Sequence, residues 1–257
     1  MKRREFLAAG IAGTAGIKAA AASIDKNEKS KRQYFELRQY HVINRSKVGE
    51  VGDFLREVGI PAMNRIGIQP VGVFTPMYGA SSSTLYVLLV HRFLDSVEQA
   101  SERLLADEEF RKSEFVNATL GEPGYVRMES SLMVAFKDMP KLEVPEKKSR
   151  IFELRIYESH SVKAGKKKIE MFNEGGEIAI FRKTGLQPVF FGETLIGPKM
   201  PNLTYMLVFD DMTMRDKRWR TFGSDPEWKK LRANPAYKDT VSNITDIILR
   251  PTRYSQI

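Results

Sequence analysis

The sequence predicts an α+β fold of two tandem ferredoxin-like modules whose sheets pack against each other within one chain. Two observations carry this prediction: a set of landmarks that occurs twice, and the same order of expected elements in each copy. The 257 residues suffice for two modules of about 110 residues each. A content of 42% hydrophobic and 28% charged residues is typical of a globular protein with an apolar core.

Four landmarks of the sequence occur twice, in the same order and at a nearly constant spacing. Agreement in both order and spacing indicates an internal duplication. The pairs are FELRQY at 35–40 with FELRIY at 152–157, GIQPV at 67–71 with GLQPV at 185–189, Tyr86 with Tyr205, and Asp107 and Phe110 with Asp225 and Trp228.

The first copy reads as strand, helix, strand, strand, helices and strand. Alternating residues predict the first strand, and apolar residues three or four positions apart from Val48 to Ala62 predict the helix that follows. Pro61 should bend or shorten that helix, and Gly67 should end it. The expected strands are 34–42, 69–75, 84–93 and 130–136, and the later helical segments are 96–105 and 107–117.

The second copy follows the same order of elements. The order suits a ferredoxin-like module, whose sheet carries helices on one face only. The bare face of each sheet must then meet another sheet, and two linked copies supply it. The expected strands are 151–158, 187–193, 203–209 and 244–249, and the expected helices are 163–183, 216–222 and 226–233. The first module is therefore placed at 34–137 and the second at 150–257, with a Pro-, Lys- and Glu-rich linker at 138–149.

The start of the chain resembles the twin-arginine export motif. Arg3 and Arg4 are followed, after one variable residue, by Phe6 and Leu7, and a short, weakly apolar stretch leads to a run of alanines. The expectation is a cleaved signal peptide at 1–22, a charged linker at 23–33, and a mature protein that is periplasmic or otherwise exported from a bacterial cytoplasm. The alternative for this segment is an amphipathic N-terminal helix. Because the apolar stretch is shorter than the roughly 20 residues that span a bilayer, no stable membrane insertion is expected after cleavage.

Composition and motifs exclude several kinds of chemistry. The chain has no cysteine, which rules out disulfides, thiolate zinc sites, iron–sulfur clusters and a cysteine nucleophile. The formal net charge is +9, but most Lys and Arg are interleaved with Asp and Glu. The sequence contains no zinc-finger, RNP1-type or recognition-helix motif, so no nucleic-acid partner is expected.

The duplicated opening, the repeated GxQPV and the segment WRTFGSDPEW at 219–228 resemble the NIPSNAP family over about 34–255. The resemblance implies the dimeric α/β-barrel fold, formed here within one chain, so the protein would be a monomeric pseudo-dimer or a homo-oligomer. Relatives in that fold include antibiotic-biosynthesis-type monooxygenases and several haem-binding families. The NIPSNAP family itself has no agreed reaction, so the resemblance implies no particular substrate.

The repeated first strand supplies the candidate ligand site. Alternation places Phe35 and Leu37 on one face, and we expect this apolar face, with its counterparts in the second copy, to pack on the helices. The opposite face would line the space between the sheets and bind a small polar or aromatic molecule, with arginines as clamps for a carboxylate or phosphate. Its six residues are Glu36, Arg38, Tyr40, Glu153, Arg155 and Tyr157. The alternative is that these carboxylates and guanidiniums only neutralise one another.

The histidines, the tryptophans and a run of three lysines are interpreted as structural residues. No histidine has a metal-binding spacing, so no metal or other cofactor is predicted; if haem is bound, His41 and His160 are the axial candidates. The aromatic residues Trp219 and Trp228 are expected to pack between helices, and the lysines at 166–168 to be a solvated helix start.

The leading functional hypothesis is a cofactor-free binding protein that holds a small molecule in the barrel. One alternative is an enzyme, either monooxygenase-like or haem-dependent. The other is a non-catalytic protein-interaction module with an inert, packed interior.

Overall fold

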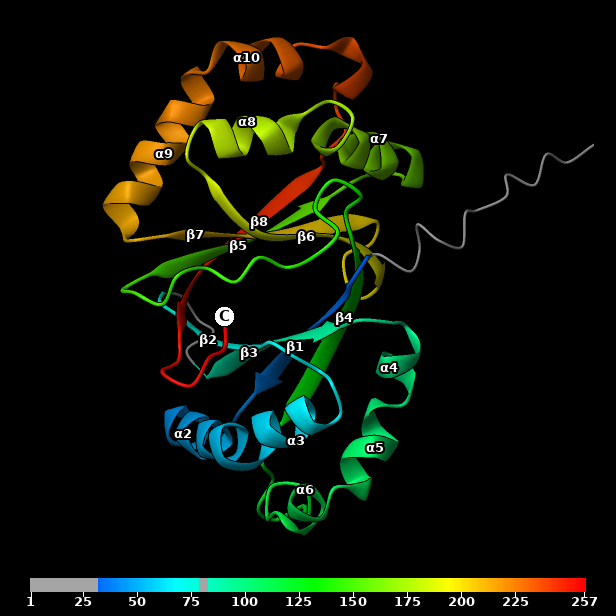
Figure 1. Cartoon of the computed structure of the whole chain (residues 1–257), viewed down its shortest axis with the longest axis vertical. Coiled ribbons are helices and arrows are strands. Elements are labelled where there is room, and N and C mark those ends of the chain that lie inside the picture. The colour runs from blue at the N-terminus through cyan, green and yellow to red at the C-terminus, as the bar shows by residue number, and fades with distance from the viewer. Residues whose placement is uncertain (1–31, 79–82) are drawn as a thin grey trace, which may run out of the picture.

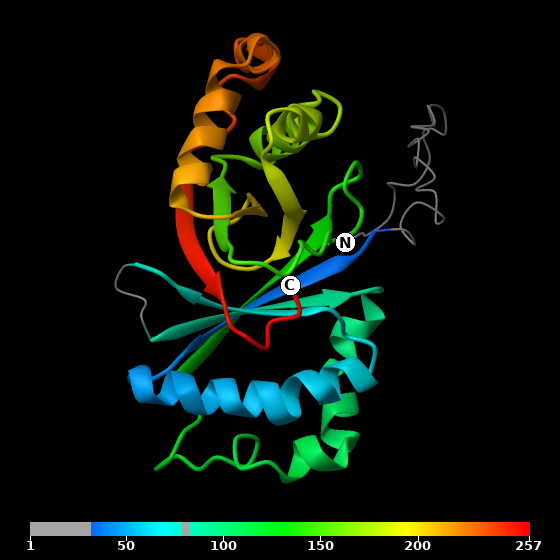
Figure 2. The same cartoon turned by 60° about the vertical axis from the view of Figure 1, so that its left-hand side comes forward.

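The structure, a computed structural model, describes residues 32–78 and 83–257. Its centre is a closed barrel of eight strands with the order β1-β3-β2-β8-β5-β7-β6-β4, in which neighbouring strands are antiparallel. The helices of the two halves cover opposite sides of this barrel (Figure 1 and Figure 2). The predicted export signal at 1–22 lies outside the described residues. In the described part of the chain, no helix is long and apolar enough to cross a membrane.

The first module has the predicted order of elements, and its first helical run continues through Pro61. Residues 45–65 form one uninterrupted helical run, in which Pro61, which has no backbone N–H, follows directly after a π-helical turn at Leu55–Gly59. The strands are β1 (Tyr34–His41), β2 (Val71–Pro76), β3 (Thr84–His91) and β4 (Arg127–Ala135), and the helices are α2 (Arg45–Phe54), α3 (Ile60–Arg65), α4 (Asp95–Glu98), α5 (Ala100–Ala106) and α6 (Glu108–Lys112).

The second module repeats this order, except that the helix expected at 163–183 is two helices. The chain breaks between them at Gly176, whose φ of 82° is one that glycine adopts at little cost. The strands are β5 (Ile151–Glu158), β6 (Gln187–Ile196), β7 (Asn202–Phe209) and β8 (Asn243–Pro251), and the helices are α7 (Val162–Phe172), α8 (Glu177–Lys183), α9 (Met212–Ser224) and α10 (Pro226–Arg232), followed by a 3₁₀ turn at Pro235–Tyr237.

Two seams join the modules edge to edge. At one, β2 pairs with β8, so that Thr75 is opposite Arg250; at the other, β4 pairs with β6, so that Ala135 is opposite Gly192. The two four-stranded sheets therefore do not stack as separate layers but close into a single barrel. Closure removes the exposed sheet edges that an isolated module would carry.

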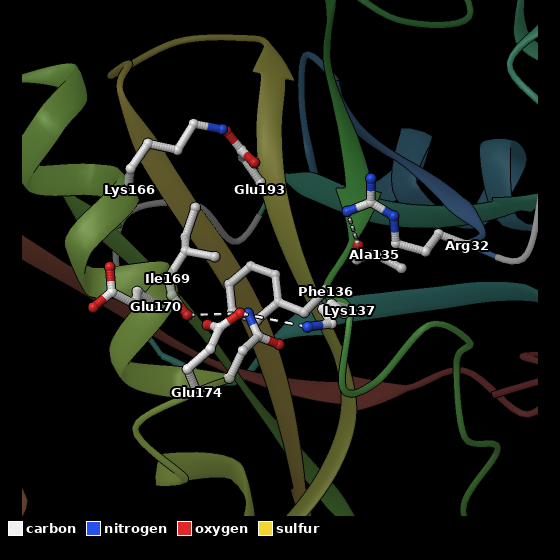
Figure 3. A pocket seen from close by; sticks show the side chains of 10 residues that line it. Arg32, Ala135, Phe136, Lys137, Lys166, Ile169, Glu170, Glu174 and Glu193 are labelled. Atoms are coloured by element: carbon white, nitrogen blue, oxygen red, sulfur yellow. Dashed lines mark hydrogen bonds and ion pairs between the residues drawn. The ribbon is translucent and has the colours of Figure 1, made fainter. Parts of the chain in front are cut away.

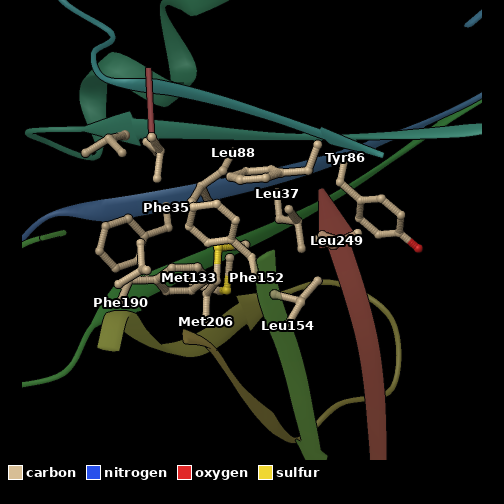
Figure 4. Close-up of a cluster of buried hydrophobic side chains, with 14 of the residues drawn as sticks. Phe35, Leu37, Tyr86, Leu88, Met133, Phe152, Leu154, Phe190, Met206 and Leu249 are labelled. Atoms are coloured by element: carbon tan, nitrogen blue, oxygen red, sulfur yellow. The ribbon is translucent and has the colours of Figure 1, made fainter. Parts of the chain in front are cut away.

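The barrel interior is filled with apolar side chains from both modules (Figure 4). Phe35 packs on Phe190 with ring centroids 4.9 Å apart, and Phe74 packs edge-on against Phe152, also at 4.9 Å. Each of these contacts joins one module to the other. The interior is therefore the shared core that fixes how the two halves sit together, in keeping with the close packing of small barrels.

A second layer of core lies between each sheet and its own helices. In both modules the first helix starts at a side-chain cap: Asn44 accepts a hydrogen bond from the backbone N–H of Lys47, and Ser161 accepts one from Ala164. The equivalent caps fix the same starting point of the helix relative to the strand before it. Residues of the two modules can therefore be compared position by position.

Candidate functional site

The charged face of the repeated strand lies outside the barrel, beneath the helices, so the predicted orientation is wrong. Phe35 and Leu37 point into the barrel interior with Phe152 and Leu154, whereas Tyr40 packs in the helix layer of the first module. A closed eight-stranded barrel has room inside only for side chains and is sealed by strands on all sides, so it takes the apolar face. The layer beneath the helices has open edges, where the ends of Glu and Arg can find partners or water.

In the first module, Glu36 is the centre of an ion-pair cluster. Its carboxylate accepts two hydrogen bonds from Arg38, at 2.7 and 3.0 Å, and one from Ser130 at 2.8 Å, and His91 Nε2 lies 3.4 Å away. Burial raises the pKa of Glu36, but the contacts with His91, Arg38 and Ser130 outweigh burial and lower the pKa to about 2. The carboxylate is thus fully engaged within the protein, as the alternative of mutual neutralisation describes.

In the second module, Glu153 has a larger set of donors. Its side chain is 1% exposed and accepts hydrogen bonds from Arg155 at 2.7 Å, from two nitrogens of Arg215 at 2.7 and 3.0 Å, and from the indole of Trp219 at 2.7 Å. The predicted pair of Glu153 and Arg155 is therefore extended to α9. One buried carboxylate positions side chains from a strand and a helix together.

Arg155 lies against two aromatic rings of the second module. Its guanidinium carbon lies 4.6 Å from the ring centroid of Trp219 and 5.4 Å from that of Tyr157, within the range of a cation–π contact. Its Nε is 3.1 Å from a carboxylate oxygen of Asp246. With Glu153 hydrogen-bonded to Nη1, the guanidinium is held between two carboxylates and the two rings.

A pocket of about 520 Å³ lies between the sheet and the helices of the second module. Both tryptophans of the chain line it, and so does Tyr157, the one residue of the predicted six that does so. Six of its sixteen lining residues are aromatic, which suits a planar body with a few polar contacts. The aromatic members are Tyr157, Phe181, Trp219, Phe222, Trp228 and Tyr237.

A buried ion pair belongs to the same lining. Lys168 Nζ lies 2.7 Å from an oxygen of Glu177, and both side chains are almost fully buried. The ammonium also faces Phe172 at 4.5 Å and Trp228 at 5.8 Å from their ring centroids. Burial raises the pKa of Glu177, and the neighbouring Lys168 opposes this effect.

Two phenols lie beside this ion pair. The hydroxyl of the fully buried Tyr205 donates a 2.9 Å hydrogen bond to the hydroxyl of Tyr157. Burial raises the pKa of Tyr157 and raises that of Tyr205 well above its usual value, so both phenols stay protonated over the physiological range. The pocket lining therefore includes the neutral hydroxyl of Tyr157, several aromatic faces and the ion pair of Lys168 with Glu177.

The first module has valines at the positions that correspond to Lys168 and Tyr205 of the second module. Val51 follows the Asn44 cap by the same seven residues that separate Lys168 from Ser161. In the same way, Val87 pairs with Arg38 in the register in which Tyr205 pairs with Arg155. The duplication has thus kept the Glu–x–Arg–x–Tyr strand in both copies, whereas Lys168 and Tyr205 of the second copy have valines as counterparts in the first.

The predicted match of Tyr86 with Tyr205 is out of register by one residue. In the strand ladder the counterpart of Tyr205 is Val87, and Tyr86 corresponds to Thr204. A shift of one residue moves a side chain to the other face of a strand. Tyr86 accordingly lies in the barrel interior, whereas Tyr205 lies beneath the helices.

Sequence reasoning missed Lys168, which was expected to be solvated as part of a lysine run. It is 5% exposed, because it falls on the buried stripe of α7 with Ala164 and Met171. The signal was present: three to four residues separate it from the apolar positions on each side, which is the helical period of a buried face. Trp219 and Trp228 do pack against helices, as expected, but their rings also border the pocket.

The histidines are placed away from the pocket. His41 contacts Thr84 at 3.1 Å at the end of β1, His91 is fully buried beside Glu36, and His160 is exposed just before α7. The described residues include no cluster of three or more His, Asp or Glu side chains arranged to hold a metal ion. Haem bound through His41 or His160 stays a prediction.

A second pocket, of about 430 Å³, lies near the seam of β4 and β6 and is lined mostly by polar side chains (Figure 3). Its charges pair across the opening: Lys137 is 3.7 Å from Glu174, and Lys166 contacts Glu193. The second-module pocket has six aromatic lining residues, whereas Phe136 is the one aromatic residue of this lining. It is therefore the better candidate for a ligand.

Comparison with known proteins places the sequence in a family. The NIPSNAP family model matches residues 35–140 and again residues 152–256. A NIPSNAP-like domain protein from Burkholderia xenovorans is 24% identical, with a TM-score of 0.38, and the match covers 42% of this chain and 90% of that one. No curated protein matches the chain.

Two longer structural matches share the fold over 86% of the chain. A candidate monooxygenase from Fusobacterium nucleatum has a TM-score of 0.58 at 12% identity, covering 86% of this chain and 92% of its own. An anthrone oxidase-like protein has a TM-score of 0.52 at 9% identity, with the same coverage of 86% and 92%. At such identities the likeness concerns the fold, not the reaction.

Proposed function

This chain belongs to the NIPSNAP family, with two copies of the domain in one polypeptide, and we propose that its second copy binds a small planar aromatic molecule. The site is the pocket beneath α7–α10, not the interior of the barrel. The observation that carries the proposal is the lining itself, in which aromatic rings are held in place by buried ion pairs. Rigid aromatic walls lose little conformational entropy when a flat ligand enters.

The positions of Glu153 and Arg155 indicate that the pocket wall is held in a fixed conformation. Glu153 fixes the indole of Trp219 through a hydrogen bond, and Arg155 lies against the face of the same ring. The ring edge and the ring face are thus both constrained by buried groups. A surface aromatic residue that merely covers a core needs neither constraint.

The chain offers a direct way to test the proposal, because its two tryptophans are both in the pocket. An NMR spectrum of the ¹⁵N-labelled protein contains two indole N–H signals, assigned with Trp219→Phe and Trp228→Phe. Naphthalene-sized planar probes are expected to shift both signals in a saturable manner. A cyclohexane-based probe of similar volume serves as the control and should shift them much less. Saturable binding that leaves both indole signals unchanged would place the ligand elsewhere and refute the proposal.

A second candidate function is oxidation of an electron-rich aromatic compound within the same pocket. Glu177 favours it, since a buried carboxylate with a raised pKa is a suitable proton acceptor. The names of the two longer structural matches point in the same direction. The test is consumption of dioxygen with anthrone, in which anthrone and O₂ would yield anthraquinone and water. Activity that Glu177→Gln abolishes supports the enzyme; no uptake above the uncatalysed rate rejects it for this substrate.

The cellular location remains a proposal that rests on the residues at 1–22. We propose export to the periplasm through the twin-arginine motif at Arg3 and Arg4. Replacing both arginines by lysine should retain the precursor in the cytoplasm, which fractionation of the native host detects. A precursor that is still exported and shortened after this change would contradict the assignment.

A further inference from the structure

We propose that the ligand of the second-module pocket is an aromatic anion, a planar ring that carries a carboxylate or a similar acidic group. This inference rests on the proposed function and adds the charge of the ligand. Two separate features of the pocket support it: the way its interior cation is held, and the basic residues at its lining that have no acidic partner.

The first feature is that the pocket's site for a cation is already filled by the protein. Three aromatic rings and one carboxylate surround the ammonium of Lys168, at 4.5 Å from Phe172, 5.8 Å from Tyr157 and 5.8 Å from Trp228, with Glu177 at 2.7 Å. Rings and a carboxylate arranged in this way recognise ammonium groups of ligands. Because Lys168 occupies that position, a cationic ligand would meet a positive charge where its own charge should lie.

The second feature is a pair of basic side chains among the lining residues. Arg232 and Lys238 both line the pocket, both are exposed, and neither forms an ion pair with any described residue. Other basic side chains of this region differ in one respect or the other: Lys183 and Arg215 form ion pairs, with Asp225 and with Glu153. Lys229 and Lys230 form no ion pair with a described residue but do not line the pocket. Uncommitted cations beside aromatic faces provide hydrogen-bond donors for an acidic group of a ligand.

The surface around the pocket also carries a net positive charge. Residues 212–239, which form the arm of α9, α10 and the turn after them, contain eight Lys and Arg against four Asp and Glu. Asp239 is the one acidic side chain that lines the pocket besides the compensated Glu177. The balance at the opening is therefore two cations against one anion, and the arm adds a longer-range attraction for an anionic ligand.

The test compares three probes of the same shape and different charge: 2-naphthoate, the neutral 2-naphthamide and the cationic 2-naphthylmethylammonium. Their affinities for the full chain are measured by calorimetry, and the two indole N–H signals report whether each occupies the pocket. We expect 2-naphthoate to bind at least tenfold more tightly than 2-naphthamide, and the cation to bind least. The advantage of 2-naphthoate should shrink as salt is raised, because part of it is a screened interaction.

Variants separate the charge effect from the pocket itself. The double variant Arg232→Gln with Lys238→Gln should remove most of the preference for 2-naphthoate and leave the affinity for 2-naphthamide unchanged. Lys229→Gln is the matched control, because Lys229 is an exposed cation of α10 that does not line the pocket. Equal affinities of the three probes, or a preference for the cation, would overturn the anion inference while leaving the pocket standing. Absence of any indole shift with all three probes would reject both.

Discussion

The indole nitrogen of Trp219 donates a 2.7 Å hydrogen bond to the carboxylate of Glu153, and this contact joins the repeated strand to the pocket wall. The sequence predicts Glu153 as a ligand-binding residue on the repeated strand. Its actual contacts are all within the protein, since Arg155, Arg215 and Trp219 supply its donors. Its contribution to binding is therefore to position the wall.

Replacing Glu153 by Gln should destabilise the protein by about 3 kcal/mol, because the change leaves Arg155 and Arg215 without their buried counter-charge. Urea denaturation gives this value, and the indole signal of Trp219 should move while that of Trp228 stays nearly in place. Glu227→Gln is the control, since Glu227 forms an exposed pair with Lys183 and should change stability by less than about 1 kcal/mol. Equal effects of the two variants would contradict the supporting role.

The Glu36 cluster predicts a loss of stability in acid. The folded pKa of Glu36 is about 2, below its ordinary value of 4.5, so its stabilisation is complete above pH 4.5 and is lost as the pH falls towards 2. The shift corresponds to about 3 kcal/mol. The stability difference between the wild type and Glu36→Gln should therefore shrink by about this amount between pH 6 and pH 2. Parallel pH profiles of the two proteins would show that the carboxylate is not held in this way.

Truncation of Lys168 should create a cavity that accepts a small ammonium ion. Lys168→Ala leaves Glu177 buried without its partner, at a cost of about 3–5 kcal/mol. Propylammonium should bind in the cavity and raise the melting temperature of the variant. At a concentration tenfold above its Kd it should add about 1.4 kcal/mol to the free energy of unfolding. The matched neutral compound 1-propanol should have no comparable effect. If both compounds stabilise the variant equally, or if neither does, the rings of Phe172, Tyr157 and Trp228 do not form a selective site for an ammonium ion.

The packed interior of the barrel predicts a large effect of a single truncation. Phe190 is fully buried and packs on Phe35 across the two modules, so Phe190→Ala should cost about 3–5 kcal/mol. Phe93→Ala is the control, because this side chain is 56% exposed and its loss should change stability by about 0.5 kcal/mol or less. If the interior were an open ligand chamber, the two variants would differ little in the free energy of unfolding.

The sequence identifies part of the candidate site, but it predicts a structural role for the tryptophans and the wrong face of the sheet for Tyr157. Tyr157, Trp219 and Trp228 were all noticed, and all three line the pocket. Lys168 and Glu177 were not connected, because the break of the helix at Gly176 brings them together across two helices. Sequence spacing measures distance along one element and does not reveal contacts made after such a break.

The sequence by itself determined the duplication, the order of elements in each module and the grouping of alternate residues on common faces. Periodicity shows that Phe35 and Leu37 share a face, but it does not show which layer covers that face. Only the tertiary structure decided this, through the pairing of β2 with β8 and of β4 with β6. Closure makes the space between the modules the most completely sealed part of the molecule, so the apolar face lies inside and the charged face lies beneath the helices.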